Sequence, residues 1–334
     1  MSGGLMGPYL EKGEWQIGAS LSQFSSDQTF LGSTELQNSS VITGSGTLDF
    51  QGAYALTRRF NLIADVPVVL WANWSLPLAG TRYEQKARGI ADTVIGGRLW
   101  LLNTEKNTKQ NVAFGLGLRL PTGNSNYQYP YPNGLGQNII NRSDFSGIQP
   151  GSGAWGLRLT AQGFRQFRHF SVYGTGLYLF SLKQQNDTLF IGASLSPAGP
   201  QSVPANIRYV STPDSYLFNA GVAAPIPHLK AISFSFGGQV AGVPVWNVLT
   251  GTQGFRQPGY IVTILPGLAY NTNFASYFIT VPVRMYAYIL PNYLGTAEDA
   301  NVAKTSLQLG INFHLGGKRK PHADTGGAVG GTTK

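Results

Sequence analysis

Seven charged residues of the sequence stand in segments where bulky apolar residues alternate with small or polar ones. Successive side chains of a β-strand point to opposite faces, so we expect these charges on the faces that carry glycine and polar residues. Carboxylates and guanidinium groups on such faces can pair with one another, or they can line a passage and select what crosses it. Both interpretations stay open for Asp49, Asp65, Asp92, Arg98, Arg119, Arg158 and Arg284.

Other kinds of chemistry have little support. The four histidines show neither H-x-x-x-H nor H-E-x-x-H spacing, and there is no cysteine, so no metal site is predicted. The glycine-rich segments do not open helices, which argues against phosphate-binding loops. No Ser–His pair is placed for nucleophilic catalysis. We therefore expect no enzyme activity, no cofactor and no metal.

The clearest alternation runs from Gly89 to Gly123 and predicts a β-hairpin. In its second half Val112, Phe114 and Leu116 alternate with alanine and glycine, and the polar segment NTEKNTKQ connects the halves. Cross-strand neighbours should bring Asp92 opposite or diagonal to Arg119. A bulky apolar face against a sparsely charged, glycine-rich face fits a membrane barrel with lipid outside. A secreted β-sandwich is the alternative.

The amino-acid composition narrows the class of protein to which the chain can belong. Only 12% of the 334 residues are charged, about half the usual share of a soluble domain. The sequence has no run of 18 or more apolar residues, so it predicts no transmembrane helix. The net charge of +9 does not indicate nucleic-acid binding, because the basic residues sit in turns, a tail and scattered strand positions.

Period-two alternation predicts twelve strands, most of them long enough to cross a bilayer when tilted. Prolines at 67, 225, 266 and 282 fall inside these runs, so we expect a bulge or a strand end at each. The predicted strands are 14–24, 45–57, 61–75, 89–102, 111–121, 153–165, 170–182, 215–225, 231–244, 259–271, 275–290 and 304–315.

The connections alternate between short and long, as in an outer-membrane barrel with short periplasmic turns and long extracellular loops. A sandwich has no reason to place every long loop at one end. We therefore predict an all-β fold, a transmembrane antiparallel up-and-down β-barrel of about twelve strands. The long connections are 25–44, 76–88, 122–152, 183–214, 245–258 and 291–303.

Aromatic residues support this fold because most outward ones lie near strand ends, where girdles meet the membrane interfaces. The residues assigned to the outward face are Trp15, Tyr54, Trp74, Trp155, Tyr178, Tyr216, Tyr260, Tyr270 and Tyr277.

Three parts are predicted along the chain: an N-terminal periplasmic segment (1–13), the barrel (14–315) and a flexible periplasmic tail (316–334). The first residues lack the charged and apolar regions of a secretory signal peptide. We expect a mature form, exported to the bacterial outer membrane, whose leader has been removed. The basic cluster at 318–320 could touch anionic lipid headgroups or belong to a solvated linker.

The final strand resembles the assembly signal of bacterial outer-membrane barrels at Gln308, Gly310, Phe313 and Leu315. The resemblance implies recognition by the barrel-assembly machinery. That signal usually ends the chain, so the tail after it is a departure.

Residues 89–160 resemble the meta-pathway phenol-degradation outer-membrane family in the segments GIADTVIGGRLWLL, GLGLRLPTGN and QPGSGAWGLRL. Asp92 falls on the family's aspartate, although Ala91 stands where glycine is common, and the residues Pro121, Thr122 and Gly123 match. The resemblance implies a transporter of small, often aromatic, compounds.

The loop 122–152 carries Tyr127, Tyr129 and Tyr131, which could stack an aromatic or sugar ring or could simply pack within the loop. The loop itself could fold inward or lie outside.

Together these features predict an outer-membrane channel for passive passage of small, aromatic or hydrophobic solutes through a constricted lumen. The alternative is a non-conducting barrel that acts in binding, as an adhesin or as a structural or assembly component. The expected partners are outer-membrane lipid, lipopolysaccharide, the barrel-assembly machinery and a small-molecule solute, with no nucleic acid. An oligomer or a partner subunit stays open.

Overall fold

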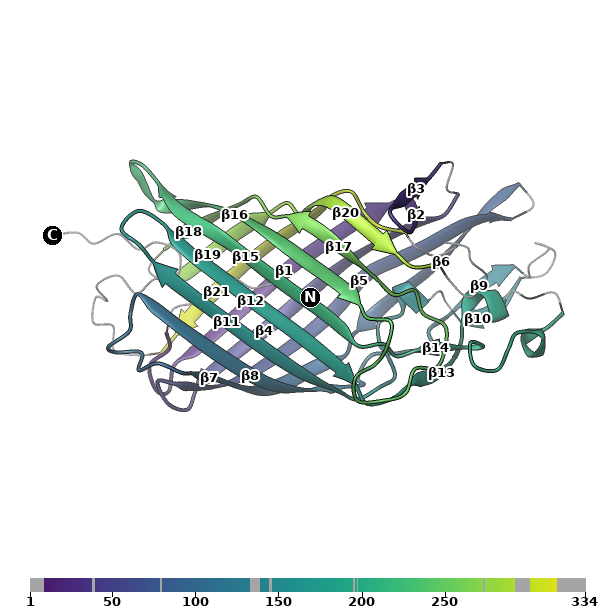
Figure 1. The fold of residues 1–334 in the computed structure, drawn as a ribbon, viewed down its shortest axis with the longest axis horizontal. Helices are drawn as coiled ribbons and strands as arrows, with labels where there is room; N and C mark the ends of the chain where they lie inside the picture. The colour runs from purple at the N-terminus through teal and green to yellow at the C-terminus, as the bar shows by residue number, and fades with distance from the viewer. Residues whose placement is uncertain are drawn as a thin grey trace.

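The computed structural model shows a closed antiparallel β-barrel whose strands tilt strongly against the long axis (Figure 1). No helix among the described residues is long and apolar enough to span a membrane. The structure describes residues 9–37, 40–78, 80–132, 139–143, 146–194, 196, 198–272, 274–291 and 301–316.

Fifteen strand segments share the main sheet, and three spans are each broken into two segments, which leaves twelve spans. The first and last strands pair in antiparallel register from Trp15↔Leu315 to Phe24↔Ser306, closing the barrel. The spans are β1 (Trp15–Ser26), β4 (Ile42–Ala55), β5 (Phe60–Leu78), β6 (Thr81–Ile90) with β7 (Thr93–Trp100), β8 (Gln110–Leu120), β11 (Gly156–Gln166), β12 (Ser171–Ser181), β15 (Ser215–Ile226), β16 (Leu229–Val243), β17 (Gly259–Ile264) with β18 (Gly267–Asn271), β19 (Ala275–Thr280) with β20 (Val283–Ile289), and β21 (Ser306–Leu315).

The predicted fold class is therefore confirmed, and three of the four prolines lie at the irregularities expected for them. Pro266 separates β17 from β18, and Pro282 separates β19 from β20. The β15–β16 register shifts beside Pro225. At Pro67 the prediction is wrong, because β5 continues through this residue in regular pairing with Asp49. The break lies instead in the neighbouring span, between β6 and β7, where the N–H of Ala91 donates to the carbonyl of Pro67 at 2.8 Å.

The barrel is apolar outside and small or polar inside. In β8 the exposed side chains include Phe114 and Leu116, which are 53% and 54% accessible, whereas Ala113, which lies between the exposed Val112 and Phe114, is buried. This arrangement inverts a soluble sheet, where the large apolar face is buried. It matches a wall that faces lipid with its bulky side and a lumen with the other.

Trp74 does not follow the predicted outward parity. Val69 pairs with Thr47 and Trp71 with Gly46, so Leu70 is an extra residue in β5. A bulge of one residue exchanges the two faces of the strand beyond it. Consequently Leu70 and Trp71 are both exposed, whereas Trp74 is 2% accessible and faces inward.

The long connections gather at one barrel end, here called the loop end (Figure 1). They contain β2 (Thr29–Leu31), β3 (Thr34–Leu36), β9 (Gln128–Pro132), β10 (Ile139–Ser143), β13 (Gln185–Leu189) and β14 (Tyr209–Ser211), and the short helices Ser146–Ile148, Ile191–Ser194 and Pro200–Ser202. The segment predicted as the loop 76–88 is instead largely a continuation of the β5–β6 ladder.

These connections share an apolar cluster, here called the roof. Its buried members come from the first long connection (Val41), from the β5–β6 hairpin and from the later connections, and include Trp74, Tyr131, Ile148, Phe190, Val210 and Phe255. The rings of Phe190 and Phe255 stack with centroids 4.4 Å apart. The roof is therefore a small folded layer and not a set of separate loops.

The opposite end, the turn end, receives the residues that precede β1. The ring of Tyr9 lies 5.1 Å from that of Trp100 and 5.9 Å from that of Phe164. Leu10 is 3% accessible and packs with Ala53 and Ala55. The wall residues contacted carry the inward parity, so this segment occupies the barrel's inner side. Residues 1–8 and 317–334 lie outside the described residues, and the three-part division of the chain stays a prediction.

Candidate functional site

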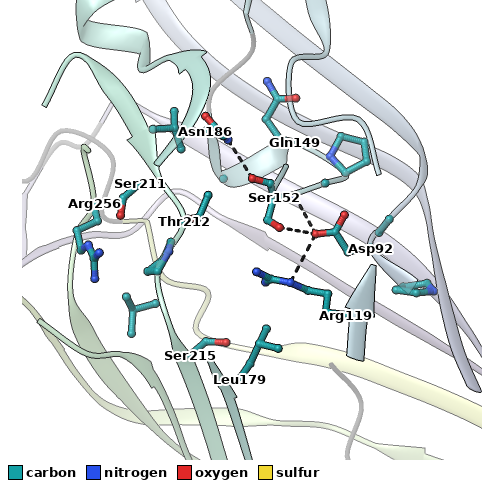
Figure 2. A pocket seen from close by; sticks show the side chains of 18 of the residues that line it. Asp92, Arg119, Gln149, Ser152, Leu179, Asn186, Ser211, Thr212, Ser215 and Arg256 are labelled. Carbon is teal, nitrogen blue, oxygen red and sulfur yellow. Dashed lines mark hydrogen bonds and ion pairs between the residues drawn. The ribbon is translucent and has the colours of Figure 1, made fainter. Parts of the chain in front are cut away.

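A cavity of about 550 Å³ lies between the roof and the inner wall near the loop end, and we call it the chamber (Figure 2). This volume is in the range of small-molecule sites. Apolar lining residues include Val94, Leu179, Val210, Val243 and Phe255. The charged lining residues are Asp49, Asp65, Asp92, Arg119, Arg158 and Arg256, three of each sign.

Two identical tripeptides on neighbouring strands place two of the arginines. Gly-Leu-Arg occurs at 117–119 in β8 and at 156–158 in β11, and the antiparallel register sets Gly117 opposite Arg158 and Gly156 opposite Arg119. A Cβ on Gly156 would lie 2.9 Å from Arg119 Nε, and one on Gly117 would lie 3.7 Å from Arg158 Nε. Each arginine therefore extends over the glycine of the other tripeptide.

The two arginines end in different surroundings. Arg158 Nη1 donates to Asp65 Oδ2 at 2.9 Å, although two further spans, β7 and β8, separate β11 from β5. Among the described residues the one ion pair of Arg119 is with Asp92, with 3.9 Å between Nε and Oδ2, which exceeds hydrogen-bond distance. The expected proximity of Asp92 and Arg119 is thus observed, without a direct hydrogen bond.

The carboxylate oxygens of Asp92 accept hydrogen bonds from both ends of the loop 122–152. Oδ1 accepts from the N–H of Gly123 at 3.1 Å, and Oδ2 accepts from the N–H and the hydroxyl of Ser152 at 2.9 and 2.5 Å (Figure 2). Gly123 and Gly151 approach so closely that a Cβ on Gly151 would lie 2.2 Å from Gly123 O. The Asp92 carboxylate, directly before β7, therefore holds the two ends of the loop 122–152 together.

A second carboxylate of this kind, Asp214, was not among the sequence candidates. It is fully buried and accepts from the N–H of Ser181 at 2.7 Å and the N–H of Val248 at 2.8 Å. Its own N–H donates to Asn247 Oδ1 at 3.0 Å. The available signal was an aspartate directly before a strand in a chain with few charges, the setting that also holds Asp92.

Arg256 was also missed because it lies in a long connection and not in a strand. Its Nη1 donates to Asn247 Oδ1 at 3.0 Å, which links it to the network around Asp214. Within the described part of the chain, its Nε and Nη2 have no hydrogen-bond partner. Burial lowers the pKa of this guanidinium below its ordinary value, and the negative charge of Asp214 opposes the shift.

Two predicted lumen residues lie outside the chamber. The guanidinium of Arg98 stacks over the ring of Trp100 at 5.6 Å, towards the turn end. Arg284 donates to the carbonyl of Val302 and, at 2.6 Å, to Gln28 Oε1, and it lies 4.3 Å over the ring of Phe30. The seven charges therefore do not form one constriction, and five of them line the chamber.

The tyrosines of the loop 122–152 have different positions. Tyr131 is fully buried, with its ring 6.0 Å from that of Trp74 and 6.1 Å from that of Tyr83. It packs in the roof, which is the packing alternative for this residue, and a ligand contact by Tyr131 stays a prediction. Tyr127 packs partly against the same cluster, and a binding role for Tyr127 and Tyr129 stays a prediction.

The final strand shows why one residue of the proposed assembly signal is glycine. A Cβ on Gly310 would lie 2.2 Å from the ring of Phe278, which occupies that space on the inner side of the wall. Phe313 pairs with Ile17, whose side chain is exposed on the apolar face. Recognition of Gln308, Gly310, Phe313 and Leu315 by an assembly machine stays a prediction.

Comparisons with known proteins support the fold. No family model matches the chain, and no curated protein matches it. The COG4313 outer membrane channel from Pseudomonas putida F1 aligns with a TM-score of 0.61 at 13% identity, covering 94% of this chain and 99% of that chain. The translocator domain of autotransporter NalP from Neisseria meningitidis aligns with a TM-score of 0.46 at 12% identity, covering 91% of this chain and 89% of that chain.

The first of these likenesses shows a shared outer-membrane barrel fold, and the second is too low to carry an argument. Together with the apolar exterior, the fold identifies the chain as an outer-membrane β-barrel. The resemblance of residues 89–160 to the meta-pathway phenol-degradation family is not confirmed by these comparisons and stays a prediction.

Proposed function

We propose that the protein is a channel of the bacterial outer membrane through which small solutes diffuse passively. The observation that carries the proposal is the chamber, a cavity with six charged lining residues inside a closed barrel. Charged side chains inside a barrel are costly unless they are paired or serve a passage. The loop end is then extracellular and the turn end periplasmic.

The lumen constriction of this channel is formed by Asp49, Asp65, Asp92, Arg119 and Arg158. The three carboxylates balance the arginines of the chamber wall and Arg256, so the sum of the charges in the chamber is near zero. Selection should therefore depend on size and charge placement more than on net charge. The resemblance of residues 89–160 adds that the solute is small and aromatic or hydrophobic.

One observation favours the second candidate, a non-conducting barrel with a binding or structural role. Both ends of the lumen are occupied, by the roof at the loop end and by Tyr9 and Leu10 at the turn end. A barrel closed in this way would hold a ligand or a partner without passing it.

Single-channel conductance in planar bilayers separates the two functions. The full chain should give small, reproducible conductance steps. The Tyr9→Ala/Leu10→Ala variant should give larger steps, because its contacts with the inner wall are lost. Leu62→Ala, on the exposed face of β5, is the matched control and should behave as the parent. Absence of conductance in all three proteins would favour the non-conducting barrel.

A further inference from the structure

Arg119 is a buried cation whose hydrogen-bonding capacity is unused. The residue is 8% accessible, and within the described part of the chain its Nε and Nη2 have no hydrogen-bond partner. Asp92 does not fill this role, because its Oδ2 lies 3.9 Å from Arg119 Nε, beyond hydrogen-bond distance, while its oxygens accept from Gly123 and Ser152. A buried polar group without a partner is unfavourable, so the site is complete only when an acceptor enters it.

The other inward arginines of the described strands each have a partner. Arg158 pairs with Asp65, Arg98 stacks on Trp100, and Arg284 donates to Val302 and Gln28. Single nitrogens of Arg98 and Arg158 also lack a partner among the described residues, but each of those side chains is held by another contact, and Arg119 is not.

A second guanidinium lines the same chamber from another element. Arg256 extends from the 245–258 connection, and Arg119 extends from β8, so the two approach the cavity from different sides (Figure 2). One edge of Arg256 is held by Asn247, which leaves Nε and Nη2 for a further acceptor. Guanidinium groups bind carboxylates with two parallel hydrogen bonds.

The remaining lining residues define the rest of the ligand. Leu179, Val210 and Phe255 offer apolar surface beside the two arginines. Asp49 lies in the same chamber and is 4% accessible, with Oδ2 lacking a partner among the described residues. A second negative charge on the ligand would be repelled by Asp49 and by Asp65.

We propose that the chamber binds a small organic monoanion, with its carboxylate between Arg119 and Arg256 and its apolar body against the neighbouring aliphatic and aromatic residues. The inference deepens the proposed function and rests on it in one respect, namely that such a solute reaches the chamber from outside. The fit of the site itself depends only on the contacts described above.

Isothermal titration of the purified full chain in detergent tests the site without requiring transport. Benzoate is the probe, and benzamide is its neutral analogue of the same shape. Benzoate should bind, and benzamide should bind at least about tenfold more weakly, because the hydrogen bonds to a charged acceptor are lost. Equal affinity for the two probes would overturn the proposal.

Substitutions then locate the binding. Arg119→Gln should weaken benzoate binding by about 10- to 100-fold, Arg119→Lys should weaken it less, and Arg256→Gln should also weaken it. Arg165→Gln is the control, because Arg165 lies beside the exposed ring of Phe167, 5.2 Å away, outside the chamber. Heat-modifiability gels should show every variant as folded. Unchanged affinity in folded Arg119→Gln would overturn the assignment.

The outcomes also separate this inference from the proposed function. Benzoate binding without conductance in planar bilayers would contradict the channel and leave the binding site standing. Conductance without benzoate binding would contradict the binding site and leave the channel standing.

Discussion

The two Gly-Leu-Arg tripeptides have the same sequence, lie opposite each other on β8 and β11, and serve different ends. In each, the missing side chain of glycine makes room for the arginine of the other. Both arginines line the chamber, but Arg158 crosses towards β5 and pairs with Asp65, whereas Arg119 has no hydrogen-bond partner among the described residues. The pair shows that the role of a lumen charge is decided by what lies beyond its strand, not by its own neighbours in sequence.

The largest expected effect comes from removing each arginine in turn. Arg158→Ala should lower the free energy of unfolding by about 3 kcal/mol, because it leaves Asp65 in the lumen without its counter-charge. Arg119→Ala should change it by less than about 1 kcal/mol, since no hydrogen bond is broken. Urea unfolding in lipid vesicles measures both, and equal losses would remove the distinction between the two sites.

The carboxylates can be compared in the same way. Asp92→Ala removes three hydrogen bonds that join the ends of the loop 122–152, at about 1 kcal/mol each. The barrel should stay folded while the loop becomes about 10- to 100-fold more sensitive to protease. The exposed Asp187, whose side chain is 98% accessible, gives the control variant Asp187→Ala, which should leave the cleavage rate unchanged. If Asp92→Ala instead unfolded the barrel, the aspartate would belong to the wall and not to the loop.

The glycines of the two tripeptides, Gly117 and Gly156, should also differ in how much stability is lost when alanine replaces them. A Cβ on Gly156 meets both Arg119 Nε and the carbonyl of Phe180 at 2.9 Å, whereas the nearest atom to one on Gly117 is Val94 Cγ1 at 3.0 Å. Gly156→Ala should therefore cost about 1–2 kcal/mol and Gly117→Ala less. In a double-mutant cycle, Arg119→Ala should relieve part of the Gly156→Ala cost. Strict additivity would show that the arginine does not lie over Gly156 in solution.

The smallest effect tests the roof over Arg119 without changing either tripeptide. The Tyr131 hydroxyl has no hydrogen-bond partner among the described residues, so Tyr131→Phe should alter stability by less than about 1 kcal/mol at neutral pH.

Burial raises the pKa of Tyr131 to about 12, above the value of about 10 for an unfolded tyrosine. The roof should therefore lose stability as pH rises from about 10 towards 12, because the opened chain releases the proton first. Protease sensitivity of the parent should rise in this window more steeply than that of Tyr131→Phe. Parallel curves for the two proteins would show that other groups control the opening.

Period-two alternation was sufficient to predict all twelve spans, because the lipid and the lumen select opposite residue types along every strand. The prolines at 225, 266 and 282 predicted irregular positions because a proline lacks the N–H that the ladder needs, whereas β5 runs through Pro67 without a break. Alternation could not predict the bulge at Leu70, since no residue type there marks an extra position, and the parity of Trp74 was wrong as a result.

The site was predictable only as far as the strand faces determine it. Asp92 and Arg119 came together because a hairpin fixes their register. The pairing of Arg158 with Asp65 spans strands that are not neighbours, so no local rule contains it. The place of Asp214 directly before a strand was visible in the sequence, but its partners, like those of Arg256, depend on how the connections 183–214 and 245–258 pack. Their contribution became visible only in three dimensions.

The extra residue in β5 also decides which changes of length the wall can accept over generations. Leu70 is the residue without a partner on β4, so deleting it would leave Trp71 opposite Gly46 and Trp74 opposite Thr43. Regular alternation would then place Trp71 outside and Trp74 inside, as they are now. Deleting one residue from a strand that has no such bulge would instead move every later side chain to the opposite face. A one-residue gap at Leu70 is therefore a milder event than a gap elsewhere in the wall, and a sequence alignment can place one there without assigning inner residues to the outer surface.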